Sequence, residues 1–157
     1  MSIESEFLAP YIISNVVAIA MLLLAWKKPN FSRLLYILLF GWASVTNAIT
    51  AIKTPEVYLD YTRFALLPFY NNIINGFFSE HITVVVLTIA FSQLCIVILL
   101  FFEHKFLKFA LLAGILFFIG IAPLGVGAAL PSSLIWAMGL LLLFHKKLDV
   151  FKFKQVW

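Results

Sequence analysis

The chain has 157 residues, of which 64% are hydrophobic and 11% are charged, with a formal net charge of +4. Soluble domains carry about 25% charged residues, so this composition excludes an ordinary soluble protein and indicates an integral membrane protein. Each crossing of the hydrocarbon takes about 20 apolar residues, which leaves little chain for a second domain. We therefore expect residues 1–157 to form one all-α, transmembrane helical-bundle domain.

Five apolar runs are each near the length that crosses a bilayer, and they predict five transmembrane helices. The runs cover residues 7–26, 34–52, 82–102, 109–125 and 128–144. Around the boundary of the last two runs stand Pro123, Gly125, Gly127 and Pro131, which favour a tight turn rather than one long bent helix.

Lysine and arginine are unevenly distributed among the segments that flank these runs. Counted over alternate segments, nine fall on one side and two, Lys53 and Arg63, on the other. Basic residues accumulate in cytoplasmic segments, so the count places the N-terminus outside and the C-terminus in the cytoplasm. The long connection of residues 53–81 then faces outward.

This outward insert begins with a helix-start pattern: Thr54 at the cap, Pro55 at the first position and Glu56 near the positive helix end. The pattern predicts a short helix over residues 55–66, too short to cross a membrane and therefore lying at its interface. Pro68 and the stretch that contains Asn71, Asn72, Asn75 and Gly76 favour a break in the chain. The insert is expected to return as a lid over the bundle.

The aromatic and polar residues of the insert support two interpretations. In the first, its tyrosines form an interfacial aromatic belt and Arg63 extends to lipid phosphate. In the second, Arg63, the tyrosines and the asparagines form the rim of an outward-opening pocket for the head of an amphiphilic or anionic ligand. Both interpretations place the insert at the depth of the membrane interface.

The amides Asn47 and Gln93 lie inside predicted spans. An unpaired amide is costly in hydrocarbon, so both are expected to face the bundle interior, where they bond between helices or contact a ligand. Thr88, Ser92 and Cys95 recur at helical spacing and are expected to form a packing face. The candidate ligand-binding residues are Asn47, Tyr58, Tyr61, Arg63, Tyr70, Asn71 and Gln93.

No catalytic residue and no metal site is predicted. No acidic pair lies at membrane depth, which disfavours acid–base chemistry and proton relay. His81, His104 and His145 each stand at the end of an apolar run, on different sides by the topology above, so they cannot share one metal ion. The single cysteine, Cys95, excludes a disulfide or a thiolate cage within the chain. No phosphate-binding loop or nucleic-acid-binding pattern is present.

From about residue 34 onward the layout resembles the DoxX-like group of small bacterial membrane proteins. The similarity lies in the stretches FGWASVTN, LPFY, AFSQL, EHKFLK and LLAGILFFIGIAPLG, taken in order. The chain adds an N-terminal span to the four usual in that group, and Gln93 stands near a position where many members carry glutamate. The resemblance implies a bacterial cytoplasmic (inner) membrane and an association with quinone-linked or oxidoreductase complexes.

Two functions fit these observations. The first is a non-catalytic membrane subunit, or a bundle that binds a hydrophobic or amphiphilic small molecule, with the lipid bilayer and other membrane subunits as its surroundings. It needs no cofactor, and a lipid or quinone would be its ligand. The alternative is a quinone-linked membrane oxidoreductase component, in which Asn47, Tyr58, Arg63 and Gln93 would orient the ring oxygens.

Overall fold

The computed structural model describes residues 5–128, 130–146 and 148, and within them it contains six α-helices and no β-strand. The α-helices are α1 (Ser5–Lys27), α2 (Pro29–Lys53), α3 (Pro68–Ile73), α4 (Ser79–Leu99), α5 (His104–Ile121) and α6 (Ser132–His145). Three further short helices are not α-helical. They are the 3₁₀ helices η1 (Pro55–Arg63) and η3 (Ala122–Ala128) and the π-helix η2 (Ile74–Phe78).

Four stretches are long and apolar enough to cross a membrane, which confirms a multi-pass helical membrane protein. They are Leu8–Lys27, Pro29–Lys53, Pro68–Leu99 and His104–Val126. The fifth predicted span appears as α6, which has 14 residues. At 1.5 Å per residue, α6 is about 21 Å long, short of the roughly 30 Å of a hydrocarbon core.

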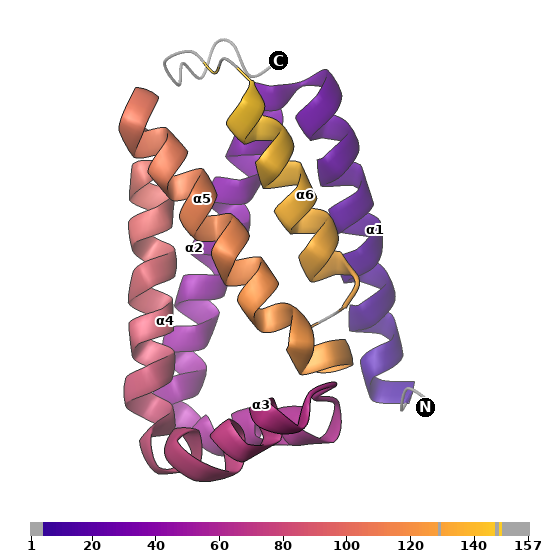
Figure 1. The fold of residues 1–157 in the computed structure, drawn as a ribbon, viewed down its shortest axis with the longest axis vertical. Helices are drawn as coiled ribbons and strands as arrows, with labels where there is room; N and C mark the ends of the chain where they lie inside the picture. The colour runs from indigo at the N-terminus through magenta and orange to yellow at the C-terminus, as the bar shows by residue number, and fades with distance from the viewer. Residues whose placement is uncertain (1–4, 129, 147, 149–157) are drawn as a thin grey trace.

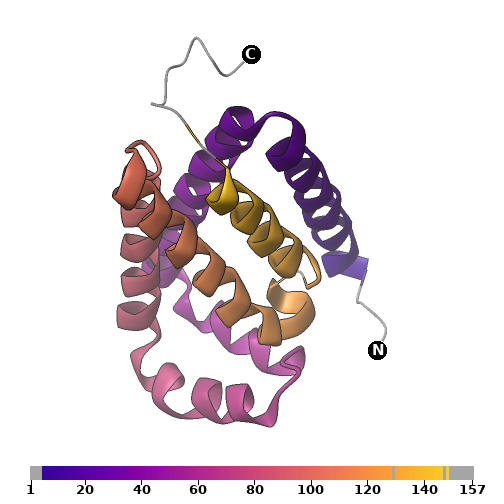
Figure 2. The same ribbon diagram turned by 45° about the horizontal axis from the view of Figure 1, so that its top comes forward.

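The five long helices close a ring. In order around the bundle, α1 packs on α2, α2 on α4, α4 on α5, α5 on α6, and α6 on α1 (Figure 1, Figure 2). The α1–α2 and α4–α5 junctions and the end of α6 lie at one end of this ring. The start of α1 and the short helices of residues 55–78, which we call the lid, lie at the other (Figure 1).

The half of the bundle away from the lid is filled by close packing. Tyr36 is fully buried and donates a hydrogen bond from its hydroxyl to the Trp136 carbonyl at 2.8 Å. A Cβ atom at Gly139 would collide with that hydroxyl, so glycine lets α6 approach α2 closely. Phe40 fills the next layer against Phe118, with ring centroids 5.2 Å apart.

Arg33 on α2 is fully buried, at 0% exposure. Its Nε donates to the Leu100 carbonyl at 2.6 Å and its Nη2 to the Phe102 carbonyl, also at 2.6 Å. These carbonyls follow the last turn of α4, where helical carbonyls need donors from elsewhere and where the helix dipole favours a cation. Arg33, one of the nine basic residues counted on the predicted cytoplasmic side, therefore ties α2 to the α4–α5 turn.

The outer face of α4 corrects one expectation. Thr88 and Ser92 are exposed on the outside of the bundle and donate back to carbonyls of their own helix, those of Val84 and Thr88, at 2.8 Å each. A hydroxyl that is satisfied within its own helix can face lipid without an unpaired group, so these two residues need no helix partner. The packing face of α4 consists instead of Val86, Ala90, Gln93 and Ile96.

The lid contains the predicted short helix, but in a different form. η1 starts at Pro55 as expected and is a tight 3₁₀ helix that ends at Arg63, while Thr54 makes no capping hydrogen bond with its side chain. The predicted break in the asparagine-rich stretch is present, but it does not lie at Asn71, which is within α3. The backbone leaves helical geometry later, at Gly76, where the chain turns into α4.

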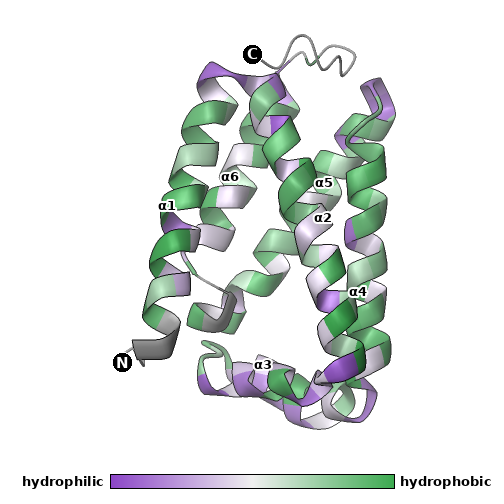
Figure 3. Cartoon of the chain, turned by 180° about the vertical axis from the view of Figure 1, so that it is seen from behind, coloured by the Kyte–Doolittle hydropathy of each residue, from purple (hydrophilic) through white to green (hydrophobic). Residues whose placement is uncertain are grey.

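Hydrophilic residues gather at the two ends of the bundle and apolar ones between them (Figure 3). At the end away from the lid, Lys146 donates to the Trp26 carbonyl and so joins the end of α6 to the end of α1. Lys147, Lys152 and Lys154, which the topology count includes, lie outside the described residues.

Candidate ligand-binding cavity

A cavity of about 820 Å³ lies in the lid-side half of the ring. Every long helix contributes to its wall, and the lid and η3 close it at the end of the bundle. Its lining is mainly aromatic and aliphatic, with few polar side chains. Cavities of 300–1,000 Å³ with this kind of lining are typical of small-molecule sites.

The lid is held over the cavity by contacts with the end of α5 and with η3. The Leu66 amide donates to the Pro123 carbonyl at 2.8 Å, and the Tyr70 hydroxyl donates to the Gly120 carbonyl at 2.6 Å. Gly125 has a positive φ of 68° and lies directly against the Phe64 carbonyl, where a Cβ atom would collide with backbone. The lid is therefore seated on a surface that requires glycine at residue 125.

A chain of polar side chains crosses one wall of the cavity. The Tyr58 hydroxyl, on η1, donates to Asn47 Oδ1 at 2.9 Å, and Asn47 Nδ2, on α2, donates to Gln93 Oε1 on α4 at 3.0 Å. Gln93 is 1% exposed. The expectation that both amides face the interior is confirmed, and they join the lid to two helices.

The hydrogen bonds between Tyr58, Asn47 and Gln93 use only one of the two polar atoms of the Gln93 amide group. Its Oε1 accepts from Asn47 at 3.0 Å, whereas its Nε2 makes no hydrogen bond within the part of the chain that the structure describes. Gln93 also lines the cavity. An amide donor in apolar surroundings gains free energy from an acceptor, so the wall offers a hydrogen-bond donor to a ligand.

The structure brings five of the seven candidate residues to the cavity: Asn47, Tyr58, Tyr61, Tyr70 and Gln93. Tyr61 packs beside Tyr58, with ring centroids 5.9 Å apart. The two tyrosines are three residues apart on η1, and a 3₁₀ helix has three residues per turn, so both face the cavity.

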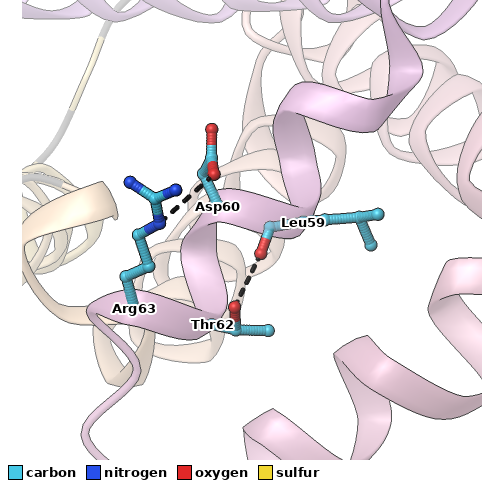
Figure 4. A network of polar contacts seen from close by, with 4 residues as sticks. All are labelled: Leu59, Asp60, Thr62 and Arg63. Atoms are coloured by element: carbon cyan, nitrogen blue, oxygen red, sulfur yellow. Dashed lines mark hydrogen bonds and ion pairs between the residues drawn. The ribbon is translucent and has the colours of Figure 1, made fainter.

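Arg63 and Asn71 are not among the residues that line the cavity. Figure 4 shows the Arg63 side chain beside Asp60, with Nε and the carboxylate 3.5 Å apart, while the two side chains are 63% and 56% exposed. In the same view Thr62 donates back to the Leu59 carbonyl, a bond of 2.8 Å within η1. The Oδ1 atom of Asn71 is buried and has no hydrogen-bond partner among the described residues.

Other lining residues escaped the sequence reasoning. Trp136 on α6 lines the cavity and packs against Phe118, with ring centroids 5.4 Å apart, and Tyr11 and Ser14 line it from α1. Each stands in a predominantly apolar run, where nothing local tells the inner face from the lipid face. The α1 residues carried a weak signal, because polar side chains within a span usually face the interior.

The lid tyrosines predict a response to alkaline pH. Burial raises the pKa of Tyr58 and of Tyr61 above the ordinary value near 10. Because the folded-state pKa is raised, the stabilisation from the neutral phenols is complete below pH 10 and is lost as the pH rises through the tyrosine range. We expect hydrogen exchange of the lid amides, referenced to α5 amides, to accelerate there, and less so in Tyr58→Phe. Equal acceleration in both proteins would contradict this assignment.

Among the described residues, no group of three or more histidine, cysteine, aspartate or glutamate side chains is arranged to hold a metal ion.

Comparison with known proteins returned no match: no protein-family model, no curated protein and no solved structure is similar to the chain at the level that counts as a match.

Proposed function

We propose that the protein binds a hydrophobic or amphiphilic small molecule in the cavity beneath the lid, as a non-catalytic multi-pass membrane protein. The observation that carries this proposal is the combination of about 820 Å³ of mainly apolar space with the chain Tyr58–Asn47–Gln93 on its wall. A buried polar chain on one wall of a mainly apolar space orients an amphiphile, because the polar end gains hydrogen bonds there while the apolar part gains contacts elsewhere in the cavity.

We further propose a membrane orientation. α6 completes a fifth crossing, the lid and the N-terminus face outward, and the C-terminus lies in the cytoplasm. The arrangement of the ring supports this orientation. The α1–α2 and α4–α5 junctions, with Lys27, Lys28, Arg33, Lys105 and Lys108 in or beside them, share the end opposite the lid (Figure 1). A bacterial inner membrane and a place in the DoxX-like group are proposed on the layout from residue 34 onward.

The experiment that tests the function is identification of the molecule that leaves the membrane with the protein. In polymer-bounded native lipid particles, we expect mass spectrometry to find one species enriched over bulk lipid, with enrichment at least about fivefold lower in Asn47→Leu. That change removes the acceptor that Asn47 offers to Tyr58 and the donor that it offers to Gln93 Oε1, and an unsatisfied buried group costs about 1–3 kcal/mol.

The matched control is Ser92→Ala, because Ser92 is exposed on the outside of α4 and bonds only to its own helix. It should retain the enriched species. An extract with the composition of bulk lipid in wild type and both variants would overturn the proposal. Enrichment of a quinone would favour the alternative function, a quinone-linked membrane oxidoreductase component.

A further inference from the structure

The cavity wall selects for an uncharged head group. Of the described residues that line the cavity, Asp60 is the only charged one, and it is paired with Arg63 outside. An anionic head would find no cation there, and an unpaired charge in apolar surroundings is strongly unfavourable. The free Nε2 donor of Gln93 instead suits a neutral acceptor such as an ester or ketone carbonyl.

The cavity volume limits the size of the ligand. A volume of about 820 Å³, at roughly 30 Å³ per water-sized group, holds on the order of 25–30 non-hydrogen atoms. That matches one long acyl chain with a small head group. Two acyl chains exceed it.

The facing sides of α1 and α2 show where the cavity opens. Near their junction the two helices touch, since Ser32 donates to the Met21 carbonyl at 3.2 Å. Met21 itself is 2% exposed. Seven and fourteen residues further along the same face of α2, Leu39 and Thr46 line the cavity instead.

Along α1, too, inner-face residues change from buried to cavity-lining toward the lid. On its inner face, Ala18 is buried, whereas Tyr11 and Ser14, nearer the lid, line the cavity. The two helices therefore separate toward the lid, and the space between them belongs to the cavity.

Two residues of α2 form the rim of this opening. Trp42 and Thr46 both line the cavity and are exposed on the outside of the bundle, Trp42 at 67%. Trp42 lies 11 residues before Lys53, the end of α2, which places it about 16 Å from the lid end of the helix. The opening is therefore at the depth of the hydrocarbon rather than in water.

We infer that the ligand is an uncharged, single-chain amphiphile with a carbonyl head, of the monoacylglycerol type, and that it enters from the bilayer between α1 and α2. Its carbonyl accepts from Gln93 Nε2 and its chain lies along the apolar wall. This inference rests on the proposed function of the same cavity and specifies the ligand class and the route.

Fluorescence quenching by brominated lipid tests the ligand class. The variant Trp26→Phe/Trp42→Phe/Trp157→Phe keeps Trp136, on the cavity wall, as its single tryptophan. In lipid nanodiscs, dibromostearoyl glycerol is expected to quench Trp136 saturably, and ionised dibromostearate only in proportion to its content in the bilayer. Gln93→Leu should weaken saturable quenching about three- to tenfold, the effect of one hydrogen bond.

The outcomes separate the two proposals. Saturable quenching by dibromostearate as strong as that by the glycerol ester, or no effect of Gln93→Leu, would overturn the ligand class but leave a binding cavity. Absence of saturable quenching by either probe would overturn binding of an amphiphile altogether.

The route is tested by narrowing the rim. In the same reporter variant, Thr46→Phe is expected to slow the approach to full quenching at least about fivefold without changing its final extent. Val45→Phe is the matched control, because Val45 is 60% exposed on α2 and does not line the cavity. Equal rates in both variants would exclude entry between α1 and α2.

Discussion

Replacing Arg33 by alanine is expected to lower the free energy of unfolding by about 3–5 kcal/mol, because two hydrogen bonds from a charged donor are lost at about 1.5–3 kcal/mol each. Both carbonyl partners follow the end of α4, and the side chain is fully buried. Glu103, at the start of α5, also loses its electrostatic attraction to the guanidinium. The α4–α5 turn should detach from α2.

The chain supplies its own control, since Arg63 is its only other arginine and is 63% exposed. Arg63→Ala should change stability by about 0.5 kcal/mol or less, as exposed ion pairs do. Arg33→Lys should lower the free energy of unfolding by an intermediate amount. An ammonium group keeps the positive charge, but it lacks the planar set of N–H donors with which a guanidinium reaches two carbonyls. Thermal unfolding in detergent measures all three proteins. Similar losses for the two alanine variants would contradict the assigned role of Arg33.

Replacing Gly125 by alanine is expected to release the lid. The backbone at Gly125 combines a positive φ of 68° with a ψ of −136°, a region that side chains other than glycine rarely adopt. The added Cβ would also collide with the Phe64 carbonyl, a backbone atom that cannot rotate away. The cost of such strain is about 1–3 kcal/mol before the collision is counted. The hydrogen bond from the Leu66 amide to the Pro123 carbonyl should be lost together with the contact between the lid and Gly125.

Hydrogen exchange of the η1 and α3 amides measures this release, with protection expected to fall at least about tenfold in Gly125→Ala. Gly120→Ala is the control, since a Cβ atom added at this helical residue would meet nothing within 4 Å. There alanine should be neutral or stabilising by up to about 1 kcal/mol. Unchanged lid protection in Gly125→Ala would show that the lid is held without this contact.

The membrane class of this protein and most of its helices follow from local features of the sequence. The number of apolar residues in a run and the absence of charge within it are local properties, and they suffice for a membrane-length helix. Pro55 marked the start of η1 for a similar reason, since proline fixes its own backbone angle. Asn47 and Gln93 could be placed inside because an amide in lipid must find a partner.

Which helix faces meet, and where the bundle leaves a cavity, depend on contacts between segments that are far apart in the sequence. The partners of Arg33 stand 67 and 69 residues further along the chain, so nothing near residue 33 distinguishes this buried arginine from a loop cation. Thr88 and Ser92 were expected on a packing face but lie on the outside of the bundle. A hydroxyl that is bonded to its own helix can face either lipid or the bundle interior. The cavity depends on α1 separating from α2 toward the lid. That separation follows from packing among distant segments, which periodicity along one helix does not encode.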